Sequence, residues 1–225
     1  MSLSKQNWIA AGVALLLAFA SPVGALTSAS AADRDLDAET WVQDLATEAT
    51  EMLSSSDTTG TDIAVEFQSL LTEQAAMRNF GRSALGPYSR TLDDDEFDRF
   101  IALLEQYGTG VVRSRFSEYS GQTIVVTDSS VDARENFAYV NVNSDVLSIH
   151  GDVTASVRWL LIRRGGDYRV YDITVETTDE TATFSLLQTQ REEFNSVLSS
   201  NGGRIEFLLD YLRQRIRESG MEPAN

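Results

Sequence analysis

Few side chains in this sequence combine the types and spacing that catalysis requires. His150 is the single histidine and the chain has no cysteine, so a Ser-His-Asp triad or a Cys-His pair would depend on this one residue. A zinc site would have no second histidine or cysteine to complete it. His150 stands in the stretch SIHGD, which is typical of a turn, and we expect it to have a structural or solvent-exposed role.

Asp172 is the carboxylate that best suits acid–base chemistry. In the predicted strand it alternates with Tyr171 and Ile173 and falls on the polar side, opposite to both. There it could serve as the general base of an α+β pocket enzyme of the ketosteroid-isomerase type. The alternative is that Asp172 pairs with an arginine such as Arg158 or holds the start of a helix. Nothing else in the sequence points to an enzyme.

Other acidic and glycine-containing stretches do not match ligand-binding motifs. The run DDDEFD at residues 93–98 lacks the glycine and the spaced oxygens of a calcium loop, and it suits the solvated first turn of a helix. The pairs Gly165-Gly166 and Gly202-Gly203 match no phosphate-binding motif and are expected in turns. We therefore expect no metal, no cofactor and no enzymatic activity.

The first 32 residues have the pattern of a cleaved export signal. Lys5 precedes an apolar stretch, residues 9–20, that Pro22 and Gly24 end, and small residues follow up to Ala32. An uncleaved anchor is the alternative, but the apolar stretch is well below the roughly 20 residues that a spanning helix needs. Residues 33–225 are expected to form a single exported, periplasmic domain.

The expected mature chain is strongly acidic. Removal of Lys5 leaves 17 of the 18 basic residues, all of them arginine, against 34 acidic residues. Binding to nucleic acid requires clustered cations at the phosphates, so this balance argues against a nucleic-acid partner. The negative charge also argues against stable association with an anionic membrane surface.

Hydrophobic periodicity divides the mature chain into helices, then strands, then helices. Helical spacing is predicted over residues 37–55, 63–74 and 91–119, with irregular structure over 78–90 and a bend or split at Gly108 and Gly110. The period then becomes two in residues 122–128, 135–143, 152–164 and 167–176, with a tight hairpin at Gly165-Gly166. Helical spacing returns around Phe194 and over residues 205–216. This order predicts an α+β domain whose antiparallel sheet of about four strands is covered by N- and C-terminal helices.

Three stretches carry an ordered set of motifs. Residues 80–122, FGRSALGPYSRTLDDDEFDRFIALLEQYGTGVVRSRFSEYSGQ, hold a phenylalanine, then Leu-Gly-x-Tyr, then an amphipathic helix that ends in Tyr-Ser-Gly. RVYDITVE follows at residues 169–176, and SLLQTQREEFNSVLSSNGGRIEFLLDYLRQR at 185–215. The set resembles the MlaC (toluene-tolerance) family of periplasmic phospholipid-binding proteins, over nearly all of the chain from about Asp37 to Arg217.

The resemblance implies a twisted antiparallel sheet, helices packed over it, and a deep apolar pocket between sheet and helices for lipid tails. It implies a soluble carrier that moves phospholipid between an outer-membrane lipoprotein–porin complex and an inner-membrane ABC-transporter complex, and so maintains outer-membrane lipid asymmetry. One departure is an insertion of about six residues, 177–182, after which Thr183 stands where the family usually has glycine. The insertion puts the shape of the pocket mouth in doubt but not the fold.

The residues expected to contact lipid share an apolar face and a position in the family-like segments. They are Phe80, Leu85, Tyr88, Tyr107, Val111, Val140, Val157, Trp159, Ile173, Val175 and Leu186. Periodicity alone does not separate a pocket from a filled core, because the same apolar stripe serves both. An isomerase-type enzyme that uses Asp172, or a non-catalytic envelope interaction module with a solid interior, are therefore the alternatives to a lipid carrier.

Overall fold

The computed structural model describes residues 34–54, 60–115, 119–178 and 183–224, which belong to two compact units. The sheet unit comprises the described residues up to 54 and from 119 to 185, and the helical unit comprises residues 60–115 and 186–224. The predicted signal segment and most of the 177–182 insertion lie outside the described residues. The single domain over residues 33–225 and its lipid pocket stay predictions.

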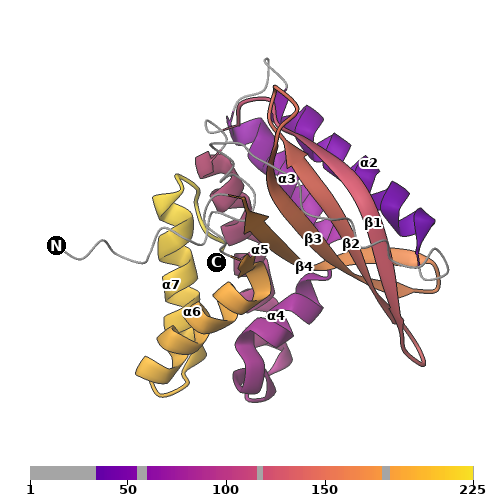
Figure 1. Cartoon of the computed structure of the whole chain (residues 1–225). Helices are drawn as coiled ribbons and strands as arrows, with labels where there is room; N and C mark the ends of the chain where they lie inside the picture. Colours follow the sequence, from indigo (N-terminus) through magenta and orange to yellow (C-terminus); the bar gives the residue numbers. More distant parts are fainter. Residues whose placement is uncertain (1–33, 55–59, 116–118, 179–182, 225) are drawn as a thin grey trace. The chain divides into compact units, whose positions relative to one another are not determined.

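An antiparallel sheet forms the centre of the sheet unit (Figure 1). Its strands follow chain order: β1 (Thr123–Ala133), β2 (Ala138–Leu147), β3 (Val153–Arg164), β4 (Asp167–Thr177) and β5 (Thr183–Ser185). The α+β class and the antiparallel sheet are confirmed, with five strands in place of the four expected. The fifth spans three residues, too few for a period of two to show in the sequence.

The hairpin between β3 and β4 has the predicted tight turn. Arg164 pairs with Asp167, and Gly165 and Gly166 have φ values of 58° and 99°. Two consecutive residues with positive φ are what a type I′ turn requires, and glycine adopts this conformation without steric cost. The turn therefore fixes the register with which β4 begins.

A β-bulge changes which face of β4 one side chain occupies. Leu160 pairs with Asp172 whereas the next residue, Leu161, pairs with Val170, so β4 carries Tyr171 as an extra residue. The Tyr171 ring lies 6.0 Å from the ring of Tyr139, on the face opposite to the buried core. The expectation that Tyr171 shares the apolar face of the residues after it is therefore wrong, because strict alternation does not continue through a bulge.

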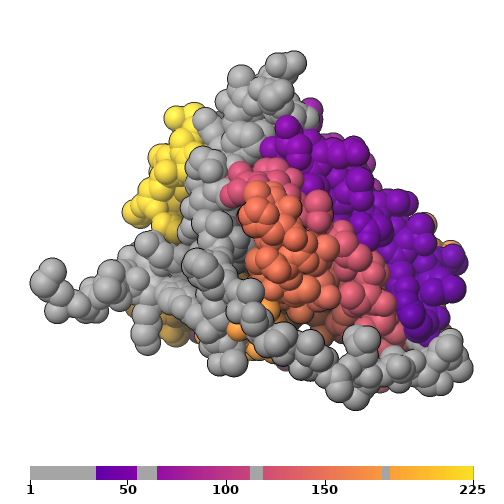
Figure 2. Space-filling model, turned by 45° about the horizontal axis from the view of Figure 1, so that its top comes forward, coloured from indigo at the N-terminus to yellow at the C-terminus, as the bar shows by residue number. Residues whose placement is uncertain are grey.

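Helix α2 (Leu36–Ser54) covers part of the apolar sheet face and also closes the edge of β1. Its buried Ala38 and Val42 belong to the same apolar cluster as the strand residues. The Gln43 side chain donates to the carbonyl of Ile124 and accepts from the amide of Val126, both at 3.0 Å. In Figure 2, α2, coloured indigo, runs beside the pink strand β1. Because a side chain of the helix forms hydrogen bonds with backbone groups of this edge strand, the edge is protected from pairing with another chain.

The helical unit contains five α-helices and one 3₁₀ helix among the described residues. They are α3 (Gly60–Gln74), α4 (Met77–Leu85), the 3₁₀ helix η2 (Gly86–Arg90), α5 (Asp94–Arg115), α6 (Leu186–Ser200) and α7 (Ile205–Glu218). The prediction of irregular structure over residues 78–90 is wrong. Phe80, Ala84 and Leu85 form a buried face of α4, so tertiary packing overrides the local glycines, and Gly86 with φ 57° ends the helix.

Helix α5 begins and continues for identifiable reasons. The amide of Glu96 donates to the Asp93 carboxylate at 2.8 Å, and the amide of Asp93 donates to the Glu96 carboxylate at 3.0 Å. This reciprocal capping box confirms the acidic run as a helix start. The expected split at Gly108 and Gly110 is absent from α5, which is continuous from Asp94 to Arg115. A Cβ at Gly110 would lie 2.4 Å from Ser219 Oγ, so this glycine permits a close approach instead.

Within the described residues, no helix combines the length and hydropathy needed to cross a membrane.

Candidate functional site

Five of the predicted lipid-contacting residues lie on one face of the sheet. Val140, Val157, Trp159 and Val175 are buried and Ile173 is half-buried, and all five belong to one apolar cluster. Cross-strand pairing brings Trp159 opposite Ile173 and Val157 opposite Val175. Helix α2 packs chiefly on β1 and more lightly on β2. The apolar face therefore continues over β3 and β4, beyond the strands that α2 mainly covers.

The polar end of Trp159 is held within the sheet unit. Its indole Nε1–H donates to Ser144 Oγ at 2.9 Å, and the Ser144 hydroxyl lies 3.3 Å from the carbonyl of Val157. A buried indole N–H that lacks an acceptor is costly, so this bond selects one orientation of the ring. Trp159 consequently presents a fixed apolar surface next to Ile173.

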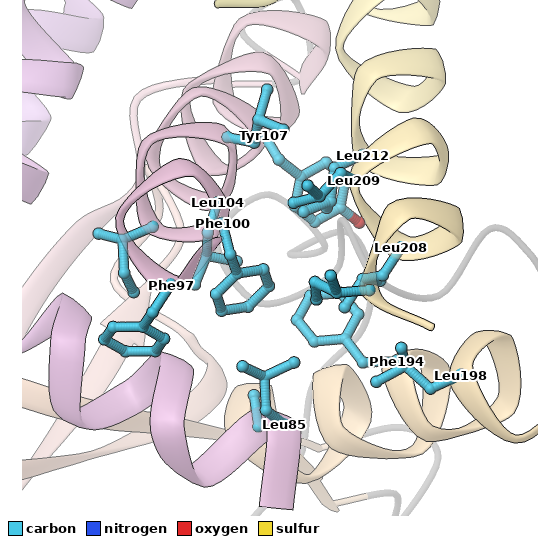
Figure 3. Close-up of a cluster of buried hydrophobic side chains, with 14 of the residues drawn as sticks. Leu85, Phe97, Phe100, Leu104, Tyr107, Phe194, Leu198, Leu208, Leu209 and Leu212 are labelled. Atoms are coloured by element: carbon cyan, nitrogen blue, oxygen red, sulfur yellow. The ribbon is translucent and has the colours of Figure 1, made fainter. Parts of the chain in front are cut away.

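The other six predicted residues lie in the helical unit. Phe80, Leu85 and Tyr107 are buried in its apolar cluster, and Tyr88, Val111 and Leu186 are half-buried against the same cluster. Figure 3 shows Tyr107 of α5 beside Leu209 and Leu212 of α7, and Phe194 of α6 beside Leu208 of α7. Phe100 and Phe194 meet edge to face at 5.8 Å between centroids. The eleven predicted residues thus fall into two apolar clusters, one in each unit.

A group of polar side chains interrupts the apolar cluster of the helical unit. We call it the polar junction: Tyr107 of α5, Gln190 and Glu193 of α6, and Tyr211 and Arg215 of α7. The Tyr211 hydroxyl donates to the Glu193 carboxylate. Within the described residues, the Tyr107 hydroxyl, both Gln190 amide atoms, Glu193 Oε2 and Arg215 Nε have no partner with good hydrogen-bond geometry, although Gln190 lies close enough to Tyr107 and Glu193 to lower the pKa of each. Buried polar atoms without a partner oppose close packing of the three helices.

Burial controls the ionisation of the polar junction. It raises the pKa of the Glu193 carboxyl, although the Tyr211 hydroxyl and the Arg215 charge lower that pKa in part. Burial and then the neighbouring Glu193 charge raise the pKa of Tyr107. Burial also raises the pKa of Tyr211, and the hydrogen bond to Glu193 and the charge of that carboxylate raise it further. Both tyrosines therefore remain neutral hydrogen-bond donors at neutral pH.

The polar junction was not predicted from the sequence, although one signal was present. Gln190, Phe194 and Leu198 follow one another at intervals of four residues and are all buried. A glutamine in the apolar stripe of an amphipathic helix marks a polar group inside the core. Tyr107 was expected on an apolar face, and Glu193 and Arg215 are charged residue types that usually face solvent.

The sheet unit contains a second buried polar group, which we call the anchor network. Asp35, only 7% exposed, accepts from the Ala38 amide at 3.0 Å and from the Tyr168 hydroxyl at 2.8 Å, and it forms an ion pair with Arg163. Its own amide donates to Ser129 Oγ at 2.8 Å. Asp35 thus caps α2 and ties the start of that helix to β1, β3 and β4.

Glu39 extends the anchor network towards solvent. It accepts from Ser129 Oγ at 2.7 Å and from Arg34 Nε at 2.8 Å. The hydrogen bond from Arg34 is the main cause of the lowered pKa of Glu39, and Ser129 lowers it further. Sequence reasoning missed this network because its members lie far apart in the chain.

The candidate catalytic and metal-binding residues occupy structural positions. Asp172 accepts from the Ile173 amide at 2.8 Å and from the Ser185 hydroxyl at 2.7 Å, and Ser185 directly precedes α6. This arrangement resembles the expected role of holding a helix start more than that of a base. His150 is exposed in the turn between β2 and β3. Among the described residues, no group of histidine, aspartate or glutamate side chains could hold a metal ion.

Comparison with known proteins adds a family and a fold. A family model described as MlaC protein matches residues 43–214, a range that contains all eleven predicted lipid-contacting residues. The solved structure of a phospholipid-binding protein from Ralstonia solanacearum, in complex with a phospholipid, is similar at a TM-score of 0.63 and 15% identity. The similarity covers 84% of this chain and 99% of that one. No curated protein sequence matches this chain.

Proposed function

Because the chain belongs to the MlaC family, we propose that it binds a phospholipid and carries it across the periplasm. The observation that carries the proposal is the apolar face over β3 and β4, where Val157, Trp159, Ile173 and Val175 lie together beyond the strands that α2 mainly covers. The Ralstonia structure, which shares the fold, holds a phospholipid and gives further support.

The energetics of lipid transfer explain why a carrier needs extensive apolar contact. Each CH₂ group withdrawn from water contributes about 0.8 kcal/mol. A phospholipid with two acyl tails and about 30 such groups therefore needs on the order of 20 kcal/mol of compensation when it leaves a bilayer. We propose that the acyl tails contact the eleven candidate residues, and that no covalent step is involved.

The finer part of the proposal concerns the route. We propose that the mature protein shuttles lipid between an outer-membrane lipoprotein–porin complex and an inner-membrane ABC-transporter complex of the Mla type, and so maintains outer-membrane lipid asymmetry. The chain has 34 acidic and 18 basic residues. This negative balance supports such a carrier, because it disfavours adhesion to anionic bilayers. Loading and unloading would then depend on partner proteins.

Mass spectrometry of the freshly purified mature protein tests the proposal directly. We expect the mass increment of one phospholipid per chain, retained through washing and released by organic solvent. A protein that is lipid-free as isolated and takes up none from phospholipid vesicles would contradict the proposal and favour an interaction module with a solid interior.

Substitutions on the sheet face test the lining residues. Trp159→Asp places a charge without a partner on the apolar face and should lower the amount of bound lipid. Val125→Asp is the matched control, because Val125 on β1 is 43% exposed. If Trp159→Asp prevents folding, Ile173→Asp replaces it, since Ile173 is only half-buried. Unchanged lipid content in a folded variant would exclude that residue from the lining.

A further inference from the structure

Three of the candidate lipid-contacting residues lie inside the packed core of the helical unit. Phe80, Leu85 and Tyr107 are buried in its apolar cluster, and Leu85 is fully buried. Protein cores are packed to the density of organic crystals, so an acyl tail cannot enter such a cluster without displacing its members. If these residues contact lipid, as the proposed function holds, helices of this unit must separate.

The polar junction is a weak place in this core. Its members come from α5, α6 and α7, so it lies where these three helices meet. Tyr107 and Gln190 are only 5% and 2% exposed, yet within the described residues the Tyr107 hydroxyl and both Gln190 amide atoms lack a partner with good geometry. Such groups lose their hydrogen bonds to water when the helices pack, and they weaken the contact that buries them. Separation of the helices at this level restores those bonds.

Beyond the polar junction, the end of α7 is fastened to α5. A Cβ at Gly110 of α5 would lie 3.0 Å from Ser219 Cβ, so the two backbones approach closely there. The amide of Ala224 donates to Gln106 Oε1 of α5 at 2.7 Å, and Met221 packs against the apolar cluster. This end can therefore act as a hinge about which α6 and the first turns of α7 move away from α5.

We propose that α6 and α7 part from α5 at the polar junction and so admit the acyl tails of a phospholipid, and that an ionised Glu193 favours this open state. The inference rests on the proposed function. Glu193 Oε2 is buried and, within the described residues, has no partner with good geometry. A charged carboxylate in that position is costly, and water that enters an open junction removes the cost. The neutral acid has a proton to donate, for which the nearby Gln190 amide oxygen is an acceptor.

Three groups oppose the effect of burial on Glu193. Burial raises the pKa of its carboxyl, whereas the Tyr211 hydroxyl, the Arg215 charge and Gln190 lower that pKa in part. Arg215 is shared between two carboxylates, because its Nη1 donates to Glu218 Oε2 at 2.7 Å. Its cation therefore compensates the Glu193 charge only in part, and ionisation leaves a poorly solvated carboxylate in the closed unit.

Groups on the other neighbouring helices leave this direction unchanged. Tyr107 of α5 faces Glu193 as a neutral hydroxyl, because burial and the Glu193 charge raise the pKa of this tyrosine. On α4, which also packs against α6, Arg78 and Arg82 lie over the Phe97 ring at 4.9 and 4.3 Å from its centroid. The open state should therefore gain population as the pH rises through the raised pKa of Glu193.

Lipid uptake measured against pH tests the opening. The mature protein would take up a pyrene-labelled phosphatidylethanolamine from vesicles of phosphatidylcholine, whose charge changes little between about pH 5 and about pH 8. We expect the uptake rate of the unmodified protein to rise about fivefold over this range. Glu193→Gln should keep the slow rate at every pH, because glutamine does not titrate. Glu192→Gln, at the exposed neighbouring position, should follow the unmodified protein.

Tyr211→Phe gives a readout that a general loss of packing would not produce. The substitution removes the hydroxyl that donates to Glu193 and lowers its pKa. The midpoint of the uptake profile should therefore move to higher pH, with a slow and a fast limiting rate still present. A midpoint that does not move overturns the control by Glu193, as does a profile that Glu193→Gln leaves unchanged.

Amide hydrogen exchange separates the opening from lipid binding. Exchange of the α6 and α7 amides, divided by the chemical exchange rate at each pH, should increase with pH in the unmodified protein and stay constant in Glu193→Gln. A protein that takes up phospholipid at a rate independent of pH, with constant protection of α6 and α7, overturns the opening and leaves the proposed function intact. A protein that takes up no phospholipid at any pH contradicts the proposed function and, with it, the admission of acyl tails through this opening.

Discussion

The two units bury polar side chains in opposite ways. In the anchor network of the sheet unit, both oxygens of Asp35 have partners, and Ser129 and Glu39 continue the chain of hydrogen bonds. In the polar junction of the helical unit, Gln190 is only 2% exposed and neither of its amide atoms has a partner with good hydrogen-bond geometry within the described residues, although Tyr107 and Glu193 lie close to it. Buried polar groups that are satisfied stabilise one arrangement, whereas unsatisfied ones weaken it.

The difference predicts that the sheet unit is rigid at its anchor and that the helical unit is weakly coupled at its junction. A lipid carrier must admit and release a bulky ligand, and elements that rearrange are drawn from the less stable parts of a structure. The contrast can be tested by substitutions that remove one polar group at a time.

The largest effect is expected from Asp35→Ala. The substitution removes the cap of α2, the acceptor of the Tyr168 hydroxyl and the carboxylate that pairs with Arg163. We expect the free energy of unfolding to fall by about 3 kcal/mol, as measured by chemical denaturation. Asp37→Ala is the control, because Asp37 is exposed in the first turn of the same helix. A loss below about 1 kcal/mol would show that the anchor network is not a rigid support.

Gln190→Leu should have the opposite sign. Leucine has a similar volume and continues the stripe formed by Phe194 and Leu198, and it removes two buried amide atoms that lack a partner with good hydrogen-bond geometry. We expect the free energy of unfolding to rise by about 2 kcal/mol. Gln188→Leu, at an exposed position of the same helix, should change it little. Destabilisation by Gln190→Leu would mean that the amide is satisfied in solution and that the two units do not differ in this respect.

The parts of this fold that the sequence predicted depend on local periodicity. The strands, the Gly165-Gly166 hairpin and helices α2, α5 and α7 have clear repeats or turn residues within a few positions. Helix α4 and the bulge at Tyr171 depend on packing and on strand register, which no local window contains. Local glycines and strict alternation therefore gave the wrong expectation at these two places.

The candidate site shows the same division. The positions of the eleven candidates on apolar faces predicted that they would be buried or partly buried. The same positions did not predict that the candidates would separate into two clusters. Asp35 and Arg163 are 128 residues apart, so their pairing has no signature in either segment. Gln190 was detectable in principle, because it occupies a core position of α6. Polar contacts between residues that are far apart in the chain therefore could not be predicted from the sequence.

A smaller loss is expected when a satisfied polar pair of the sheet unit is broken. Ser144→Ala removes the acceptor of the Trp159 indole N–H. We expect the unfolding free energy to fall by about 1 kcal/mol and the tryptophan fluorescence to change as the ring loses its fixed orientation. Ser156→Ala is the control, since Ser156 is exposed and donates to Asp145. An unchanged stability would indicate that Trp159 finds another partner and that the sheet unit tolerates loss of a buried acceptor.

The smallest effect is expected in the pH dependence of stability, where Glu193 and Glu39 should act in different windows. Burial raises the pKa of Glu193, so its stabilising contribution is fully present below the unfolded value of 4.5 and is lost as the pH rises through the raised pKa. The hydrogen bond from Arg34 lowers the pKa of Glu39, so its contribution is present above 4.5 and is lost as the pH falls through the lowered pKa.

Glutamine variants separate these two contributions, because glutamine does not titrate. As the pH rises above 4.5, the stability of Glu193→Gln relative to the unmodified protein should increase. The relative stability of Glu39→Gln should instead decrease as the pH rises towards 4.5, and it should change little above that pH. Chemical denaturation at a series of pH values measures both differences. Parallel curves for the two variants would mean that the carboxyls titrate alike in the folded protein. The polar junction would then be as well solvated or as well paired as the anchor network, and the contrast between the two units would not hold.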